Sequence, residues 1–431
     1  MSEKIKNVVI LMFENRSFDR MMGWFDYNSE IDGLTPGKDC NYVNPADPSS
    51  LKICATNQGK LKDPLDPGHL YNDTTQQITG NGKLPSNQVT TADMSGFVAN
   101  FAHNYPGIIN NASALHQIMD GFSPDRIPIT YELASNYTIF DRWFSSFPGS
   151  TMPNRMYLHS ATSHGEPDTD SSKYLKGYPQ RTIYNNLDDA NIPWANYFYE
   201  IPSLLLFDEL RLGELSHYKN WATFGKDAAA GTLPPVSFLD PAYFSIGTCI
   251  VENDAHPPSD VADSEKLLKE VYETVRASPQ WNQTLFIVTF DEHGGYYDHV
   301  NTPLHAPNPD GLNVSDFNFD RLGLRVPAIL ISPWVEKGAV IHEAHGPYSD
   351  SQYEHSSVPA TLKKLFNLPN FLTKRDAWAG TFENAISLDK PRTDCPTVLS
   401  DPPAPMTKPT TTNPISQAFC KLIKQILQGK S

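Results

Sequence analysis

Residues Leu285–His299 read LFIVTFDEHGGYYDH, an apolar run of strand length followed directly by carboxylates and imidazoles. A similar run, Val8–Phe13, is followed by Glu14-Asn15-Arg16-Ser17-Phe18-Asp19. Apolar runs of this length are typical of buried strands. In α/β sheets ligands bind beyond the carboxyl ends of the strands, and clustered carboxylates there can hold a hard cation. The two runs therefore predict one site at one edge of a sheet.

Strand-like runs alternate with helical patterns along the rest of the chain. Ser264–Ala277, for example, places its apolar side chains on one stripe at helical spacing. This alternation is typical of a mainly parallel sheet covered by helices, so the sequence predicts the α/β fold class. The predicted strands are Asn7–Phe13, Thr138–Phe144, Pro193–Tyr199, Val236–Leu239, Leu285–Phe290 and Val326–Ile331.

Composition excludes several classes of protein. With 431 residues, 39% of them apolar, the chain can bury a large core as one large domain or as two lobes. A net charge of −15 argues against binding nucleic acid or an anionic membrane through bulk charge. No apolar window is long enough to span a membrane, and residues 1–7 show no signal peptide. We expect a cytoplasmic or peripheral membrane protein, with a processed secreted form as the alternative.

Two irregular regions accompany the predicted core. Residues 26–107 are rich in Pro, Gly, Asn and Asp, and we expect them to form a long loop excursion that walls the site. One catalytic domain is predicted over residues 1–395, followed by residues 396–431. This tail holds a Pro/Thr linker (401–412) and an amphipathic helix. The helix could dock on the domain, on a partner subunit or on a membrane surface. Its apolar positions are Ile415, Ala418, Phe419, Leu422, Ile423, Ile426 and Leu427.

Cysteine usage indicates neither a zinc ribbon nor a full disulfide framework. The 5 cysteines are an odd number and show no CxxC spacing. Cys40 and Cys54 could close a local loop if the protein were exported.

A third polar constellation, Pro148–Arg155, follows an apolar run and precedes a helix that we expect from Met156. A hydroxyl at such a strand-to-helix turn lies where unpaired backbone N–H groups and the helix dipole favour an anion. Alternatively, Ser150 or Thr151 caps the helix, with Pro153 in its first turn. The local pattern alone favours the cap.

Two histidines lie in turn-rich loops. His69 follows Asp66-Pro67-Gly68, and His256 follows Asn253-Asp254-Ala255. A lone histidine in a loop is most often simply solvated. Histidines that converge on carboxylates can instead contact phosphate or transfer protons. The residues alone leave both interpretations open.

The carboxylates after the two apolar runs also have two interpretations. Either Glu14 or Asp291 alone could cap the next helix. Their joint appearance in Glu14-Asn15 and Asp291-Glu292 favours a metal site. Oxygen ligands without cysteine favour Mg, Ca or Mn over a structural zinc, so we expect one divalent cation.

Four blocks carry a family resemblance: Glu14–Asp19, Ser150–Arg155, Asp291–Val300 and Glu354–Thr361. They resemble the signatures of the phosphoesterase family, which holds bacterial and plant non-specific phospholipases C and a group of acid phosphatases. The run at 372–383 is closest to the plant-type branch, although the region after it is shorter than in those enzymes. The resemblance implies an alkaline-phosphatase-like core. We therefore expect a mainly parallel central sheet flanked by helices, with long loop insertions and a C-terminal extension.

The resemblance also implies roles for individual residues. For Asn154, Arg155, His293 and His355 the resemblance implies only that they lie near the site. In the chemistry that we expect, Asn154 and the backbone N–H groups after the nucleophile hold the negative charge that spreads over the phosphoryl oxygens. The matching residues are Thr151 for the nucleophile, Glu14, Asn15, Asp291 and Glu292 for the metal ligands, and His69 and His256 for the phosphate site.

The expected activity is that of a metal-dependent non-specific phospholipase C. Such an enzyme would hydrolyse glycerophospholipids to diacylglycerol and a phosphorylated head group through a phosphothreonine intermediate. The alternatives are an acid phosphatase acting on soluble phosphomonoesters and a catalytically idle module that binds metal and lipid. Expected partners are the phospholipid or phosphomonoester substrate and a membrane surface, without nucleic acid. The sequence leaves the metal, the head group and the oligomeric state open.

Overall fold

The computed structural model describes residues 1, 3–80, 89–169, 173, 176–211, 215–243, 251–314 and 317–405. Its centre is an 8-stranded sheet in the order β11-β4-β10-β9-β1-β8-β6-β7. β1 pairs in parallel with β8 and β9, and only β10 runs antiparallel to its neighbours. The predicted α/β class with a mainly parallel sheet is confirmed. The strands are β1 (Asn7–Phe13), β4 (Thr138–Phe140), β6 (Trp194–Phe198), β7 (Tyr218–Asn220), β8 (Val236–Leu239), β9 (Thr284–Phe290), β10 (Ala328–Ile331) and β11 (Ala339–Ile341).

One predicted strand, Thr138–Phe144, proves to be two. β4 stops early, and Trp143–Phe144 forms β5, which pairs with β12 (Tyr353–Glu354) outside the central sheet. Between them, the main-chain oxygen of Asp141 accepts a hydrogen bond from Arg325 Nη1 at 2.9 Å. Because β4 and β5 belong to different sheets, the prediction of one continuous strand was wrong.

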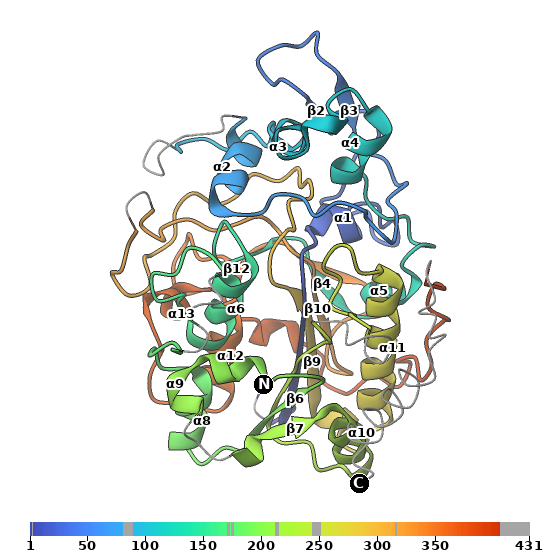
Figure 1. Cartoon of the computed structure of the whole chain (residues 1–431). Coiled ribbons are helices and arrows are strands. Elements are labelled where there is room, and N and C mark those ends of the chain that lie inside the picture. The colour runs from blue at the N-terminus through green and yellow to red at the C-terminus, as the bar shows by residue number, and fades with distance from the viewer. Residues whose placement is uncertain are drawn as a thin grey trace, which may run out of the picture.

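Helices cover both faces of the sheet (Figure 1). On one side α5 (Pro128–Asn136) and α10 (Trp221–Ala230) pack against α11 (Val261–Ala277), which buries the predicted apolar stripe. On the other side α12 (Ser357–Leu365) contacts α6 (Thr151–Ser160) and α8 (Ile183–Asp189). α9 (Asp208–Arg211) and α13 (Lys374–Trp378) also lie on that side. Short 3-10 turns lie at Pro106–Ile108, Ser203–Leu206, Leu215–His217, Trp281–Gln283 and Glu383–Ala385.

The excursion after β1 forms a cap over one end of the sheet, at the top of Figure 1. It has its own hydrophobic cluster, which includes Ile78, Phe97, Phe101 and Leu115. The predicted loop excursion is therefore a packed layer. Its elements are α1 (Phe18–Met22), β2 (Cys40–Tyr42), β3 (Lys52–Cys54), α2 (Tyr71–Thr79), α3 (Phe97–Asn104) and α4 (Ala112–Met119).

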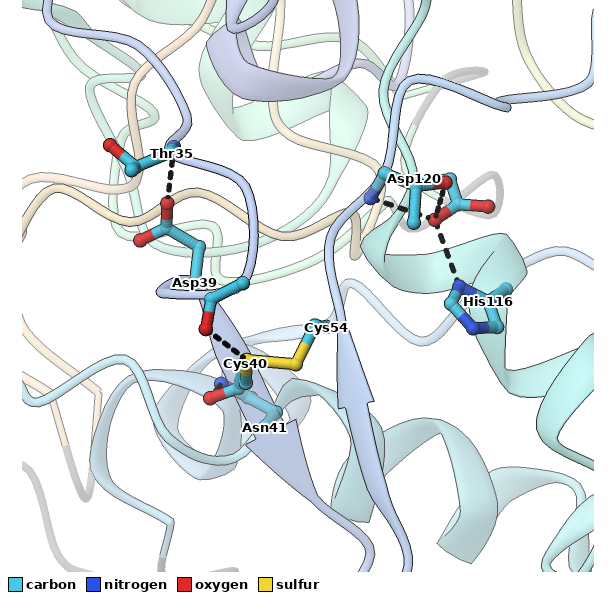
Figure 2. The surroundings of a disulfide bond; sticks show 9 residues. Thr35, Asp39, Cys40, Asn41, Cys54, His116 and Asp120 are labelled. Atoms are coloured by element: carbon cyan, nitrogen blue, oxygen red, sulfur yellow. Dashed lines mark hydrogen bonds and ion pairs between the residues drawn. A yellow bond between two sulfur atoms is a disulfide. The ribbon is translucent and has the colours of Figure 1, made fainter.

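A disulfide joins Cys40 to Cys54 and closes the β2–β3 hairpin, as Figure 2 shows. The two residues are direct partners in the antiparallel ladder, with their Cα atoms 3.9 Å apart. The sequence had left this pairing conditional. Cys395 is a buried free thiol, whereas Cys249 and Cys420 lie outside the described residues.

The C-terminal region continues to pack after residue 395. Leu399 is buried, and its N–H donates to Glu273 of α11 at 2.9 Å. The predicted domain boundary at 395 stays a prediction, and the predicted helix at 415–427 lies outside the described residues. Among the helices that the structure describes, none has the length and apolar character needed to cross a membrane.

Candidate active site

Neighbouring strands bring the predicted metal ligands together. β1 and β9 are parallel and in register up to the pair Phe13–Phe290, so the residues that follow them emerge side by side. The main-chain N–H of Asn15 donates to Asp291 Oδ1 at 3.1 Å, and Arg16 N–H donates to the Glu292 carbonyl at 3.0 Å. The two sequence blocks thus meet at one sheet edge, as their positions after apolar strands predict.

Two oxygens at this edge are buried without a hydrogen-bond partner: Asn15 Oδ1 and Glu292 Oε1. The other oxygen of Glu292 accepts from Gly294 N at 2.6 Å. Buried polar atoms in folded proteins almost always have a partner, so unpaired oxygens on adjacent side chains call for one. An amide oxygen and carboxylates are the ligands of a hard divalent cation, and this donor set fits one.

Arg155 occupies the space between Glu14 and Asp291. Its Nη2 lies 3.2 Å from Glu14 Oε1, its Nε lies 3.1 Å from Asp291 Oδ2, and its Nη1 donates to Tyr243 Oη at 2.7 Å. All these acidic groups are buried. Burial raises the pKa of Asp291 although Arg155 opposes the shift, and the nearby Glu14 raises it further. The carboxylate cluster therefore needs positive charge, of which Arg155 supplies part.

The turn before α6 carries the predicted nucleophile. The helix begins at Thr151 and not at Met156, so the predicted start was wrong. Ser150 occupies the N-cap position but makes no capping hydrogen bond; its Oγ donates to Asp168 Oδ1 at 2.9 Å. The alternative that Ser150 or Thr151 is a side-chain cap is therefore wrong. Thr151 is half-buried in the first turn.

Asn154 fixes the shape of this turn. Its Oδ1 accepts from Phe147 N at 2.8 Å, and its Nδ2 donates to the carbonyls of Phe147, Gly149 and Ser150 at 3.0, 3.0 and 3.1 Å. The N–H of Met152 donates to Thr169 Oγ1 at 3.1 Å. These groups were expected to hold phosphoryl charge, but the protein itself occupies them. The geometry instead makes Asn154 a residue that positions the turn.

The first turn of α6 is directed at the carboxylates. Thr151 and Arg155 are separated by four positions, which places them on the same face of a helix. Since Arg155 contacts Asp291 and Glu14, that face of α6 looks onto the sheet edge that carries the predicted metal ligands.

His69 and His256 converge from two loops. Their ring centroids are 6.0 Å apart, and each Nδ1 contacts a main-chain oxygen, that of Pro67 at 2.7 Å and that of Pro257 at 2.6 Å. A carbonyl partner fixes Nδ1 as an N–H donor and leaves Nε2 for a ligand or for proton transfer. With Asp66 they form a group whose ligand atoms all lie within 4.8 Å of one another. The convergence argues against two merely solvated histidines.

The charge state of His69 follows from its surroundings. Burial disfavours the imidazolium, yet Glu292 and Asp66 outweigh it and raise the pKa of His69 to about 9. A cation bound by Glu292 would offset part of that attraction. The carboxylates therefore favour the protonated ring of His69, the form that a proton donor needs.

His293 and His355 have structural contacts that the sequence did not assign. His293 Nε2 lies 2.7 Å from Gln77 Oε1 of α2, which ties the cap to the residue after Glu292. His355 Nε2 donates to the main-chain oxygen of Asp291 at 2.6 Å. Burial lowers the pKa of His355 to about 4, so this ring is neutral and holds the strand end in place.

Sequence reasoning missed Asp240 and Asp254. Asp240 is buried directly after β8 and accepts from Tyr243 Oη at 2.8 Å. The same strand-end rule that singled out Asp291 would have found it. Asp254 is buried beside Glu14: its carbonyl accepts from Glu14 N at 2.7 Å, and burial together with the Glu14 charge raises its pKa. No pattern in the sequence marks Asp254, because a loop delivers it.

A second acidic group lies further along the same two blocks. Asp19, Asp298 and His299 have ligand atoms within 4.8 Å of one another. Arg325 fills this group: its Nη2 lies 2.8 Å from Asp19 Oδ1 and its Nε lies 2.8 Å from Asp298 Oδ1. Glu14, Asp291 and Glu292 do not form such a close group, although an arginine, Arg155, likewise lies between two of them.

Known proteins resemble the chain across nearly its whole length. Residues 5–369 match the model of the Phosphoesterase family. Non-specific phospholipase C4 of Arabidopsis thaliana is 47% identical over 413 residues, which cover 93% of this chain and 75% of that protein. Phospholipase C B of Mycobacterium tuberculosis (strain ATCC 25618 / H37Rv) is 26% identical over 472 residues, covering 94% of this chain and 83% of that protein. The higher identity to the plant protein agrees with the plant-type resemblance.

Likeness to solved structures is weak. A protein in the alkaline phosphatase superfamily from Vibrio parahaemolyticus has a TM-score of 0.33 and 13% identity, over 57% of this chain and 62% of that chain. The fold class therefore rests on the sheet described above.

Proposed function

The chain belongs to the phosphoesterase family, and from that premise we propose that it is a metal-dependent phospholipase C. It would hydrolyse glycerophospholipids to diacylglycerol and a phosphorylated head group, meeting its substrate as a peripheral enzyme at the membrane surface. The observation that carries the proposal is the pair of unpaired buried oxygens, Asn15 Oδ1 and Glu292 Oε1, at the edge that α6 faces. The names of the relatives support the substrate class.

The proposed ligands of one divalent cation are Glu14, Asn15, Asp291 and Glu292. Mg, Ca or Mn suits this all-oxygen set. When bound, such a cation supplies Lewis-acid polarisation of a phosphoryl oxygen and favours the deprotonated form of a nearby hydroxyl. Arg155 forms ion pairs with Glu14 and Asp291 and so holds these two carboxylates in position.

Thr151 is the proposed nucleophile. Its Oγ1 gives its proton to water and attacks phosphorus, a phosphothreonine that still carries the head group forms, and the bond from phosphorus to the diacylglycerol oxygen breaks. Water then attacks the phosphothreonine, the bond from Thr151 Oγ1 to phosphorus breaks, and the phosphorylated head group leaves. Asn154 serves this step indirectly, since it fixes the turn that presents Thr151.

His69 and His256 are the proposed proton-transfer groups. His69, protonated beside Glu292, would donate a proton to the departing diacylglycerol alkoxide. His256, with its Nδ1 against the Pro257 carbonyl, would take a proton from the attacking water through Nε2. A positioned acid or base of this kind contributes about 10²–10⁴-fold to a rate.

Two substrates separate the proposal from its rivals. The protein, supplied with Mn²⁺, is incubated with phosphatidylcholine vesicles and separately with p-nitrophenyl phosphate, and diacylglycerol and nitrophenol are measured. The proposal expects diacylglycerol release. Nitrophenol without diacylglycerol would instead establish a phosphatase acting on soluble phosphomonoesters. Silence with both substrates, in a protein that still binds vesicles and metal, would establish the idle module.

A further inference from the structure

Asn15 combines a rare backbone conformation with an unpaired side chain. Its φ is 57°, in the left-handed region that asparagine adopts more readily than most residues other than glycine. Both amide atoms, Nδ2 and Oδ1, are buried without a hydrogen-bond partner. Even so, contacts from the surrounding structure are what hold a single residue in this region. The neighbours of Asn15 show which contacts do so.

The main chain of Asn15 is held from both sides. Its N–H donates to Asp291 Oδ1 at 3.1 Å, and its carbonyl oxygen accepts from Arg16 Nη1 at 2.7 Å. Gly294 packs against the same carbonyl, where an added Cβ would collide with it. Asp291 is itself a proposed ligand and Gly294 has no side chain. Of these three neighbours, Arg16 alone contacts Asn15 through a side chain that is not a proposed ligand.

Arg16 is an unusual arginine. Its side chain is fully buried, and no carboxylate of the described residues lies within ion-pair distance of it. Its Nε and Nη2 have no hydrogen-bond partner, and its Cζ lies 4.7 Å from the Tyr296 ring centroid. A buried charge without a partner is costly. The hydrogen bond that it donates to the Asn15 carbonyl indicates a role in holding that residue.

Arg20 provides the contrast within the same cluster. Its Cζ also lies 4.7 Å from the Tyr296 ring centroid. Unlike Arg16, it forms an ion pair with Asp63 at 2.7 Å and makes no contact with Asn15. The two arginines share one aromatic ring and a buried setting, but only one of them touches the proposed metal ligand.

We infer that Arg16 is a positioning residue for Asn15. By bonding the Asn15 carbonyl, it holds the left-handed turn and aims Asn15 Oδ1 at the cation. The inference rests on the cation site of the proposed function. Lysine cannot replace Arg16, because an ammonium group lacks the planar surface that stacks on Tyr296 while it donates sideways.

The test compares Arg16→Lys with Arg20→Lys. Mn²⁺ is titrated into each metal-free protein and followed by calorimetry, and thermal unfolding of the metal-free proteins checks the fold. Arg16→Lys should raise the Kd for Mn²⁺ by about 10–100-fold, the usual loss when a group that orients a ligand is removed. Arg20→Lys should change that Kd by less than about threefold, since it contacts no proposed ligand.

The outcomes distinguish the inference from the site itself. Wild-type affinity in Arg16→Lys, or equal weakening in both variants, overturns the role of Arg16 and leaves the cation site standing. A wild-type protein that binds no Mn²⁺ overturns both. Where Arg16→Lys does not fold, Arg16→Met, which keeps apolar contact with Tyr296, is judged by the same criterion. Failure of both variants to fold makes Arg16 a structural residue and overturns the inference.

Discussion

Two acidic clusters arise from the same pair of sequence blocks and differ in how they are closed. The first, which we call the open cluster, contains Glu14, Asn15, Asp291 and Glu292. The second, the closed cluster, contains Asp19, Asp298, His299 and Arg325. In each cluster a buried arginine pairs with two carboxylates, Arg325 with Asp19 and Asp298 and Arg155 with Glu14 and Asp291. Only the open cluster of the two keeps unpaired buried oxygens, Asn15 Oδ1 and Glu292 Oε1.

The difference teaches which cluster is suited to a ligand. The closed cluster is the tighter group of ligand atoms, so proximity alone would select it. None of its four side chains has a buried polar atom without a hydrogen-bond partner, however, so it has no oxygen left to bind a cation. The open cluster has oxygens with nothing to bond. Unsatisfied oxygens, rather than crowded ones, identify the proposed cation site.

The largest expected effect separates the nucleophile from its neighbour. Thr151→Ala should lower kcat/KM for phosphatidylcholine by about 10⁴-fold or more, since the attacking oxygen is removed. The melting temperature should stay close to that of the wild type, because Thr151 is only half-buried. Ser150→Ala is the matched control: its hydroxyl bonds Asp168, and activity should survive. A Thr151→Ala enzyme that retains several per cent of turnover would refute the assignment.

The sequence predicted the open cluster because its residues directly follow two strands that the sequence pattern identifies. Each block follows an apolar run, and parallel strands in register carry the blocks to the same edge. Thr151 needed the family resemblance, since the local pattern favoured a cap. The sequence could not show that Asn154 bonds the carbonyls of its own turn, because those bonds depend on the folded geometry. Asp254 could not be found, because a distant loop brings it beside Glu14.

Removing the arginine of the closed cluster tests whether that cluster is structural. Arg325→Met should lower the free energy of unfolding by about 3–5 kcal/mol, because it leaves Asp19 and Asp298 buried without their partner. Urea unfolding of the metal-free protein measures the loss. Mn²⁺ should still bind with wild-type affinity. If Arg325→Met instead lost Mn²⁺ binding, the closed cluster and not the open cluster would be the cation site.

The open cluster should show the opposite behaviour towards cations. A ligand at 100 times its Kd stabilises the folded state by about 2.7 kcal/mol, so Mn²⁺ should raise the melting temperature of the wild type. Asp291→Asn should abolish that rise and lower the metal content found by elemental analysis. His256→Asn should reduce turnover and leave the metal content unchanged. Loss of metal in His256→Asn would instead make the Asp66–His69–His256 group a cation site.

The smallest effect concerns the pH dependence of the closed cluster. Burial opposes the charged ring of His299, but hydrogen bonds to Asp19 and Asp32 prevail and raise its pKa from 6.5 to about 10. A raised pKa stabilises the fold fully below pH 6.5, and the contribution is lost as the pH rises through 10. His299→Gln lacks this contribution. The difference in unfolding free energy between wild type and His299→Gln should therefore shrink from pH 6 to pH 10.

The expected change is on the order of 1 kcal/mol, because Asp32 is partly exposed and solvent screens its pairing with His299. Urea unfolding at pH 6, 8 and 10 measures it. Asp298 titrates earlier, since burial raises its pKa to about 6, and it therefore contributes little to the change above pH 8. A difference that stays constant over this range would mean that His299 is neutral in the folded protein. The closed cluster would then hold its aspartates through Arg325 alone.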